Sequence, residues 1–494
     1  MNVPLVLYTV GNLVLMLSGI LLVPLGVSLY YRDVTASWGF IYTIIITGIL
    51  GGFSKAFLRK KATEIGIREA IAIVTFSWIV CIFFGAIPYW YADVCETFGD
   101  AIFESTSGFT TTGASIFKNV EALPKGILFW RSFTNWLGGM GIIVIFVTLL
   151  PAMGISGYQL FSAEVSGPTA DRLRPRIGET TKILWMIYLS ITIIVTILLA
   201  FGSMPIFDAT CHAFSTVSTA GFSTKNTSIA YYNSLYVEIV IGIFTIICAC
   251  NFSLYYMCFK KEFKKVYRNS ELQFFGGLIL TAIIFTALLL YFSRPESFYG
   301  GAKDPRYYNL GNDFRYAFFQ IATMSTTTGY VSTNYDLWPN ACRFLLILLI
   351  FIGGCAGSTA GALKCVRIVL LLKSSMREFG KIIRPRMVKH VKLNGESVSE
   401  EIITESSVFF VAYLGFFGIC TLILIALDTS IVTAFSAVAS CMANCGPGLA
   451  MVGPMANYSD IAYAGKWILC FCMLLGRLEI YSLLLLFLPI MWKR

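Results

Sequence analysis

One spaced pattern occurs four times in this chain of 494 residues and constrains its fold more than any other feature. In each copy an alanine is followed six residues later by a serine or threonine and, after six more, by a glycine. A period near 110 residues is far longer than that of a solenoid and indicates repeated modules. The copies comprise Ala101, Ser107 and Gly113; Ala209, Ser215 and Gly221; Ala317, Thr323 and Gly329; and Ala434, Ser440 and Gly446.

Composition identifies the chain as an integral membrane protein. It has 57% hydrophobic residues, 13% charged residues and a mean hydropathy of +0.74. Each copy of the pattern lies in a gap between two apolar runs, where the segment is too short to span a bilayer but long enough for a short helix and a loop. The runs long enough to span are 6–30, 36–53, 70–91, 126–150, 182–203, 232–258, 273–293, 342–372, 406–427 and 465–491.

We therefore predict an all-α membrane protein in which a span, a re-entrant pore loop and a second span occur four times. Two further spans precede the repeats, and the first has no basic region or cleavage site, which favours a retained helix. The predicted divisions are 1–53 for the two extra helices, 54–162 for repeat 1 (pore loop 101–115), 163–258 for repeat 2 (207–223), 259–372 for repeat 3 (314–331), 373–404 for a basic loop, and 405–494 for repeat 4 (429–448).

The distribution of Lys and Arg predicts the orientation. Placing the pore loops outside puts 25 of the 37 basic residues on the cytoplasmic side. This asymmetry follows the positive-inside rule. It predicts a protein of the cell (inner) membrane with both termini in the cytoplasm. The net charge of +10 is thus a topological signal and does not indicate nucleic-acid binding. The basic segment 373–404 fits either contact with lipid headgroups or docking of a cytosolic partner.

Enzymatic functions have almost no support in the sequence. It contains two histidines, no zinc-binding spacing, no phosphate-binding loop and no nucleophile–base pair. Most of the 14 cysteines lie in apolar runs, where cysteine behaves as a small hydrophobic residue. His212, nine residues before Gly221, is interpreted as a hydrogen-bonded pore-helix residue in preference to a ligand or proton relay.

The four loops have the composition that an ion path requires. Backbone carbonyls can replace the hydration shell of a cation, and they must point inward from residues in unusual conformations, which glycine adopts at little steric cost. Threonine adds a hydroxyl, and the C-terminal end of the preceding short helix carries a partial negative charge. A single such segment fits an ordinary outer loop, but four in register predict one shared pore.

Several motifs resemble the Trk/Ktr/HKT superfamily of K+ transporters, and within it the bacterial TrkH type of membrane subunit. The resemblance extends over essentially the full length, and the two additional N-terminal helices favour this type over the shorter Ktr type. The motifs are FESTSGFTTTGAS (Phe103 to Ser115), RSFTNWLGGMGIIV (Arg131 to Val144), GGCAGSTAGALK (Gly353 to Lys364), SAVASCMANCGPGLA (Ser436 to Ala450) and GRLEIYSLLLLF (Gly476 to Phe487).

This resemblance implies four repeats around a pseudo-fourfold pore, usually in a homodimer, with gating by a cytosolic TrkA-type nucleotide-binding ring. All four filter positions are glycine, which in this superfamily favours K+ over Na+. Repeats two and four lack the full TTTG, so we expect an asymmetric filter that is less selective than a tetrameric K+ channel. The implied K+ filter residues are Thr111, Thr112 and Gly113; Thr219, Ala220 and Gly221; Thr327, Thr328 and Gly329; and Asn444, Cys445 and Gly446.

Two features lie on the inner side of the predicted filter. Glycines interrupt the run 342–372, either for close helix packing or, as the resemblance favours, as a flexible gate. The predicted gate residues are Gly353, Gly354, Gly357, Ser358, Gly361 and Lys364. Arg477 lies near the centre of the last run, with Glu479 two residues on. An intramembrane charge usually faces a cavity or a partner, so Arg477 either forms a structural ion pair or faces the pore as an electrostatic barrier to cations, which we favour.

The sequence thus predicts the membrane subunit of a K+ uptake system, with a gated filter formed by four loops and no organic cofactor. K+ itself is the transported ion. The alternative is a secondary symporter that couples K+ to H+ or Na+ by alternating access, because broken helices also occur in such folds.

Overall fold

The computed structural model describes residues 1–57, 65–141, 177–293, 309–387 and 390–492. Within these ranges the regular secondary structure is helical apart from two short paired strands. Six of its helical stretches are long and apolar enough to cross a membrane, and one further bent helix pair meets the same test. An all-helical membrane protein with several apolar spans, as predicted, is confirmed. The second half of the predicted run 126–150, the predicted boundary at 162/163 and Lys493–Arg494 lie outside the described residues.

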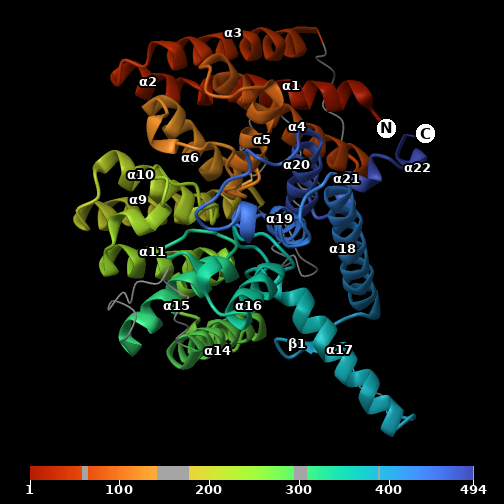
Figure 1. The fold of residues 1–494 in the computed structure, drawn as a ribbon. Helices are drawn as coiled ribbons and strands as arrows, with labels where there is room; N and C mark the ends of the chain where they lie inside the picture. The colour runs from red at the N-terminus through yellow and green to blue at the C-terminus, as the bar shows by residue number, and fades with distance from the viewer. Residues whose placement is uncertain (58–64, 142–176, 294–308, 388–389, 493–494) are drawn as a thin grey trace.

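The N-terminal helices form a layer on one side of the molecule (Figure 1). They pack against the first repeat through α4 and α6, and α1 and α3 approach each other closely. A Cβ atom added at Gly51 of α3 would lie 2.7 Å from the backbone nitrogen and the Cβ of Leu15 in α1. Small residues therefore set the spacing of this layer. Its helices are α1 (Val3–Ile20), α2 (Leu22–Tyr30) and α3 (Val34–Phe57).

Four groups of three helices follow, each with a middle helix of 12–16 residues that ends at one of the glycine loops and is called the short helix below. The alanine of the repeated pattern is fully buried in each short helix, which explains its small size. The groups are α4 (Ile67–Tyr91), α5 (Phe98–Phe109) and α6 (Lys125–Gly139); α9 (Ile177–Phe201), α10 (Ile206–Val217) and α11 (Leu235–Cys248); α14 (Ser270–Ser293), α15 (Leu310–Ser325) and α16 (Asn340–Phe351); and α18 (Glu400–Ala426), α19 (Ile431–Ala443) and α20 (Tyr463–Arg477).

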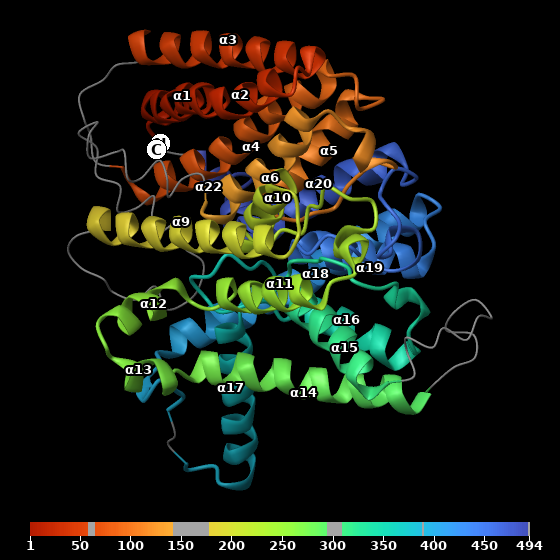
Figure 2. The same cartoon turned by 90° about the vertical axis from the view of Figure 1, so that its left-hand side faces the viewer.

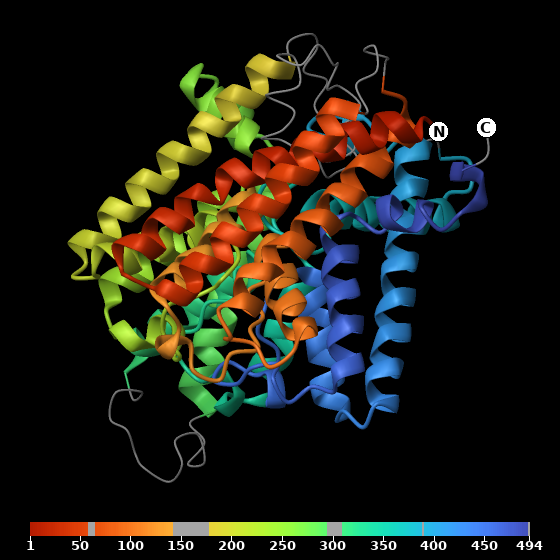
Figure 3. The same cartoon turned by 90° about the horizontal axis from the view of Figure 1, so that it is seen from above.

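The groups follow one another around the middle of the molecule in chain order (Figure 1). The third helix of each group packs against the short helix of the next: α6 on α10, α11 on α15, α16 on α19, and α20 back on α5. Ion pairs support two of these contacts, between Arg315 and Glu238 and between Lys466 and Asp100, each at 2.7 Å. Seen from above, α18 and α20 lie side by side at the right-hand side (Figure 3).

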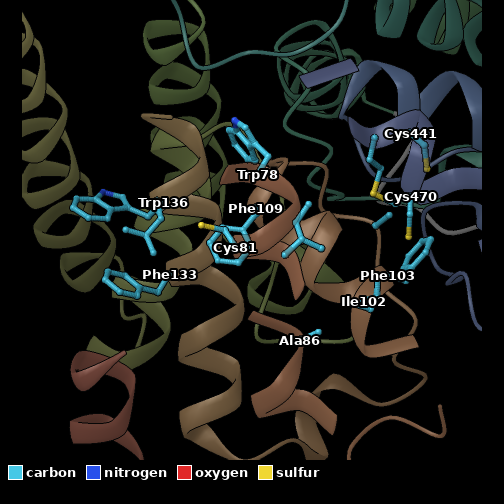
Figure 4. Packing of buried hydrophobic residues seen from close by; sticks show 14 of the residues in the cluster. Trp78, Cys81, Ala86, Ile102, Phe103, Phe109, Phe133, Trp136, Cys441 and Cys470 are labelled. Carbon is cyan, nitrogen blue, oxygen red and sulfur yellow. The ribbon is translucent and has the colours of Figure 1, made fainter. Parts of the chain in front are cut away.

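Packing around the short helices is rich in aromatic side chains. Figure 4 shows Phe133 and Trp136 of α6 together, with ring centroids 5.8 Å apart in a stacked arrangement. In the same view Phe103 of α5 lies near Cys441 and Cys470, which come from α19 and α20. Phe133 and Trp136 also contact the ring of Phe214 in α10, so buried rings of repeat 1 pack against both neighbouring groups.

Two of the third helices end in bends within the described residues. Neither 232–258 nor 465–491 forms one continuous helix: α11 and α12 (Phe252–Phe259) are bent by 91°, and α20 is followed by the separate α21 (Tyr481–Leu485) and α22 (Pro489–Trp492). Glu479 and Ile480 have positive φ angles, which a continuing helix does not allow. In repeat 3 a non-helical segment separates α16 from α17 (Cys365–Ile383).

The segment between repeats 3 and 4 is partly ordered. Because α17 continues to Ile383, the first part of the predicted loop 373–404 is helical. This helix projects from the body and runs across the direction of α14 (Figure 2). Strands β1 (Lys392–Leu393) and β2 (Glu396–Ser397) then form an antiparallel hairpin around Asn394 and Gly395, which both have positive φ as a tight hairpin turn requires. The remaining elements are α13 (Phe263–Tyr267), η1 (Val120–Ala122), η3 (Ser228–Tyr232), η6 (Tyr335–Leu337) and η7 (Ala450–Val452).

Candidate functional site: four loops and the segment beneath them

The four glycine loops share one backbone conformation. In each, the residue two before the glycine has a φ between 53° and 57°, and the glycine itself has a φ between 75° and 102°. The residue just before the glycine donates its N–H to the carbonyl of the hydroxyl residue of the repeated pattern, at 2.8–2.9 Å. These bonds join Thr112 to Ser107, Ala220 to Ser215, Thr328 to Thr323, and Cys445 to Ser440. The sequence pattern thus marks a turn that reverses the chain at the end of each short helix.

The loops close into a ring. A Cβ atom added at Gly113 would lie within 3.0 Å of the carbonyl oxygen of Ala220 in the next loop. The same holds for Gly221 against Thr328, Gly329 against Cys445, and Gly446 against Thr112, which returns to the first loop. No residue with a side chain fits any of the four positions without displacing a neighbouring carbonyl. The positive φ angles are a second, separate reason for glycine at these four positions.

The loops differ in the side-chain hydrogen bonds that stabilise them. In loops one and three the threonines flanking the positive-φ residue pair their hydroxyls at 2.8 Å, Thr110 with Thr112 and Thr326 with Thr328. Loops two and four have Ala220 and Cys445 at the second of these positions and lack this pair. The Cys445 thiol lies 3.7 Å from the sulfur of Met324.

In the fourth loop a side-chain amide makes the stabilising hydrogen bonds. Asn444 occupies the positive-φ position held by threonine in the other three loops. Its side-chain nitrogen donates to Thr112 Oγ1 at 3.0 Å and to the Met473 carbonyl at 2.9 Å. The last loop is therefore tied both to the first loop and to the helix that follows it.

A position at which the sequence analysis singled out only His212 holds the chain that follows three of the loops. Nine residues before the glycine stand Glu104, His212 and Gln320, and each contacts the chain just after its own loop. Glu104 accepts from the Ile116 N–H at 3.0 Å, His212 Nε2 lies 3.0 Å from Ser223 Oγ, and Gln320 donates to Ser332 Oγ at 3.3 Å. His212 Nδ1 also lies 2.7 Å from the Asp208 carbonyl, so both ring nitrogens have partners.

A buried ion pair joins the first loop to the second. Arg131 Nε donates to Glu104 at 2.7 Å, and both side chains are at most 2% exposed. Arg131 also donates to the carbonyl of Ser223 at 3.1 Å and lies over the ring of Phe222 at 4.2 Å, both in the second loop. The sequence signal for this ion pair is an acid and a base within otherwise apolar segments. The pair was not predicted from it.

The non-helical segment 352–364 lies directly against the loops. Its Gly361 N–H donates to Thr327 Oγ1 at 2.7 Å, and Thr359 Oγ1 lies 3.2 Å from Thr219 Oγ1. Both contacts are with positive-φ residues of the loops. A segment from repeat 3 thus touches loops two and three at the position two before their glycines.

The glycines of this segment are closely packed as well as non-helical. A Cβ atom at Gly353 would lie within 3.0 Å of the Gly361 carbonyl, one at Gly354 would lie 2.6 Å from the Ala249 carbonyl, and Gly357 has a φ of 69°. Ser358 donates to the Cys355 carbonyl at 2.5 Å, and Lys364, 4% exposed, donates to the carbonyl of Ala360. The segment is therefore held by specific contacts in this conformation.

Arg477 occupies the space between the first loop and this segment. Its guanidinium donates to the Gly138 carbonyl at 2.5 Å, to the Thr359 carbonyl at 3.3 Å and to Thr111 Oγ1 at 3.4 Å. Glu479 forms its ion pair with Arg367 of α17, at 2.6 Å. Glu479 therefore has an ion-pair partner on another helix.

Comparison with known proteins places this arrangement in a family. The profile of the TrkH family, described as a cation transport protein, matches residues 37–493. The Trk system potassium uptake protein TrkH of Salmonella typhimurium is 39% identical over 487 residues, covering 98% of each chain, and that of Escherichia coli K12 is 38% identical over the same length and coverage. The crystal structure of the potassium transporter TrkH from Vibrio parahaemolyticus matches with a TM-score of 0.87 and 36% identity, covering 100% of both chains.

The buried pair behind the first loop yields a stability prediction. Replacing Arg131 with Met leaves the Glu104 carboxylate buried without its cation, which we expect to lower stability by about 3–5 kcal/mol. The double variant Arg131→Met with Glu104→Gln removes both charges and should recover most of the loss. Thermal unfolding of the purified variants measures this effect. Equal melting temperatures for Arg131→Met and the unmodified chain would contradict it.

Proposed function

The chain belongs to the TrkH family of cation transport proteins, and we propose that it is the pore-forming membrane subunit of a K+ uptake system. Membership confirms the resemblance drawn from the sequence motifs and the expectation of a transporter in place of an enzyme. The relatives are described as potassium uptake proteins, which supports K+ as the transported ion.

The observation that carries the proposal is the closed ring of four loops with one shared backbone. We propose that the four repeats surround a pseudo-fourfold pore and that the carbonyls around Gly113, Gly221, Gly329 and Gly446 replace the water shell of K+. Four short helices end at this ring, so four partially negative helix ends favour a cation there. Loops two and four lack the paired hydroxyls of loops one and three, which supports a filter whose walls are unequal.

We further propose that the segment 352–364 gates this pore and that Arg477 raises the barrier to cations. Contacts of Thr359 and Gly361 with the inner side of the loops support the gate, because ions leaving the filter must pass this segment. The contacts of Arg477 with Thr111 and Thr359 support a fixed positive charge on the same path.

Orientation and assembly complete the proposal. The asymmetry of basic residues supports both termini in the cytoplasm. An apolar stripe on the projecting helix α17 is exposed and supports contact with a second copy in a homodimer; it comprises Leu372, Met376, Phe379 and Ile383. Control by a cytosolic TrkA-type nucleotide-binding ring rests on the family resemblance.

Replacing Gly113 with Ser tests the filter. The new side chain would collide with the Ala220 carbonyl, so we expect the K+/Na+ permeability ratio to fall on the order of tenfold, equivalent to about 1.4 kcal/mol. Bilayer recordings in K+ and Na+ gradients measure the ratio, and the size of the current also separates a pore from a coupled symporter. Gly277→Ser is the matched control, because a Cβ atom there has open space within 4 Å. An unchanged ratio in Gly113→Ser would argue against the filter.

Deleting residues 357–361 tests the gate. We expect a higher open probability with an unchanged permeability ratio, since a gate controls access and the filter controls ion identity. Single-channel recording distinguishes the two quantities. If the deletion variant folded and showed wild-type flux, the segment would have only a packing role and the gate would be contradicted.

Replacing Arg477 with Ala tests the electrostatic barrier. A unit charge about 6 Å from K+ at an effective dielectric constant near 20 repels it by about 3 kcal/mol, so its removal is expected to raise K+ flux by one to two orders of magnitude. Arg477→Lys keeps the charge and should keep flux low.

Flux and melting temperature are measured together, because Arg477 also bonds three carbonyls. Reduced flux in a stable Arg477→Ala variant would contradict the barrier, and adding Glu479→Gln should not restore it, since Glu479 pairs with Arg367.

A further inference from the structure

One buried carboxylate connects both ends of the segment beneath the loops. Glu271 lies in the first turn of α14 and is 6% exposed. Its Oε1 accepts the N–H of Ala356 at 2.7 Å and the N–H of Val366 at 3.0 Å. Ala356 lies near the start of the non-helical segment and Val366 just past its end. A single oxygen atom therefore bridges Ala356 to the start of α17, beside the backbone bonds from the Gly353 N–H to Leu363 and from the Cys365 N–H to Gly354 that also join the two ends of the segment.

These two bonds satisfy groups that the segment cannot satisfy by itself. Val366 is the second residue of α17, and first-turn N–H groups have no partner within their own helix. The side chain of the N-cap residue, Lys364, makes no capping bond to these N–H groups. A carboxylate facing a helix N-terminus is favoured by the helix dipole and makes strong charge-assisted bonds. Glu271 thus caps α17 from another helix while holding Ala356.

The start of α14 also contacts the hairpin between α17 and α18. Asn394, in the hairpin turn, accepts the N–H of Ser270 at 2.8 Å, next to Glu271 in the chain. The hairpin residue Leu393 belongs to the same buried apolar cluster as Ala356 and Val366. The hairpin, the start of α14 and both ends of the segment therefore pack as one unit.

We propose that Glu271 is a positioning residue for the gate: it holds segment 352–364 against the inner side of the loops, and displacement of the hairpin from α14 releases it. The inference rests on the proposed function of this segment. Between the two ends that Glu271 fixes lie Thr359 and Gly361, which contact the filter loops. Weakening the fixed ends frees the part that touches the filter without altering the filter itself.

Glu271→Gln tests the role at unchanged side-chain size. The neutral amide oxygen accepts weaker bonds, so single-channel open probability is expected to rise about fivefold, with K+/Na+ permeability ratio and melting temperature unchanged. Glu401→Gln is the matched control, an exposed first-turn acid on the neighbouring helix α18, and should behave as the unmodified chain. A residue with a merely structural role would lower melting temperature and the number of channels but leave open probability unchanged.

Asn394→Gly supplies a second test that does not require Glu271→Gln to fold. Glycine keeps the positive φ of the turn and removes the bond to Ser270, so open probability should rise in the same direction by a smaller factor. Combined with Glu271→Gln the increase should be less than the product, because both act at the start of α14. Unchanged or lower open probability in the folded single variants, or a shifted permeability ratio, would overturn the inference. Absence of K+ current in the unmodified chain would instead overturn the proposed function.

Discussion

The rest of the structure depends on the contact between each loop glycine and a carbonyl of the next loop. Because Gly113 lies against Ala220, and Gly446 against Thr112, no loop has a position of its own: each is set by its neighbour around the ring. The short helices must end at the same level for this ring to close, and the third helix of each group covers the next short helix. Closure of the ring and packing of the repeats are thus one constraint.

Irregular backbone at membrane depth requires partners for its polar groups, and the protein supplies them unequally. The position nine residues before the glycine is an acid in repeat 1, an imidazole in repeat 2 and an amide in repeat 3. In repeat 4, Tyr458 donates to the Gly446 carbonyl at 2.6 Å and Ser436 accepts the Leu449 N–H at 3.0 Å. Equal backbone geometry is therefore maintained by four different sets of side chains.

The repeats, the short helices and the loop glycines were predictable because each leaves a local mark: an apolar run, a buried alanine, or a glycine where no side chain fits. The bends after Cys248 and Arg477 were missed, since hydropathy does not register a change of direction within an apolar run. Partners across the fold left no local mark either. Nothing near Glu479 or Glu271 in the chain indicates that one pairs with Arg367 and the other with the ends of segment 352–364.

The segment beneath the loops comes from the third repeat and contacts the second and third loops through different residues, Thr359 and Gly361. In an assembly of four identical subunits, such an insertion would appear four times and its copies would compete for the same central space. Carrying all four walls of the ring on one polypeptide removes that conflict, so one repeat can contribute such a segment while the other walls keep their shape. A point substitution therefore changes one of the four walls of the ring and leaves the other three unchanged.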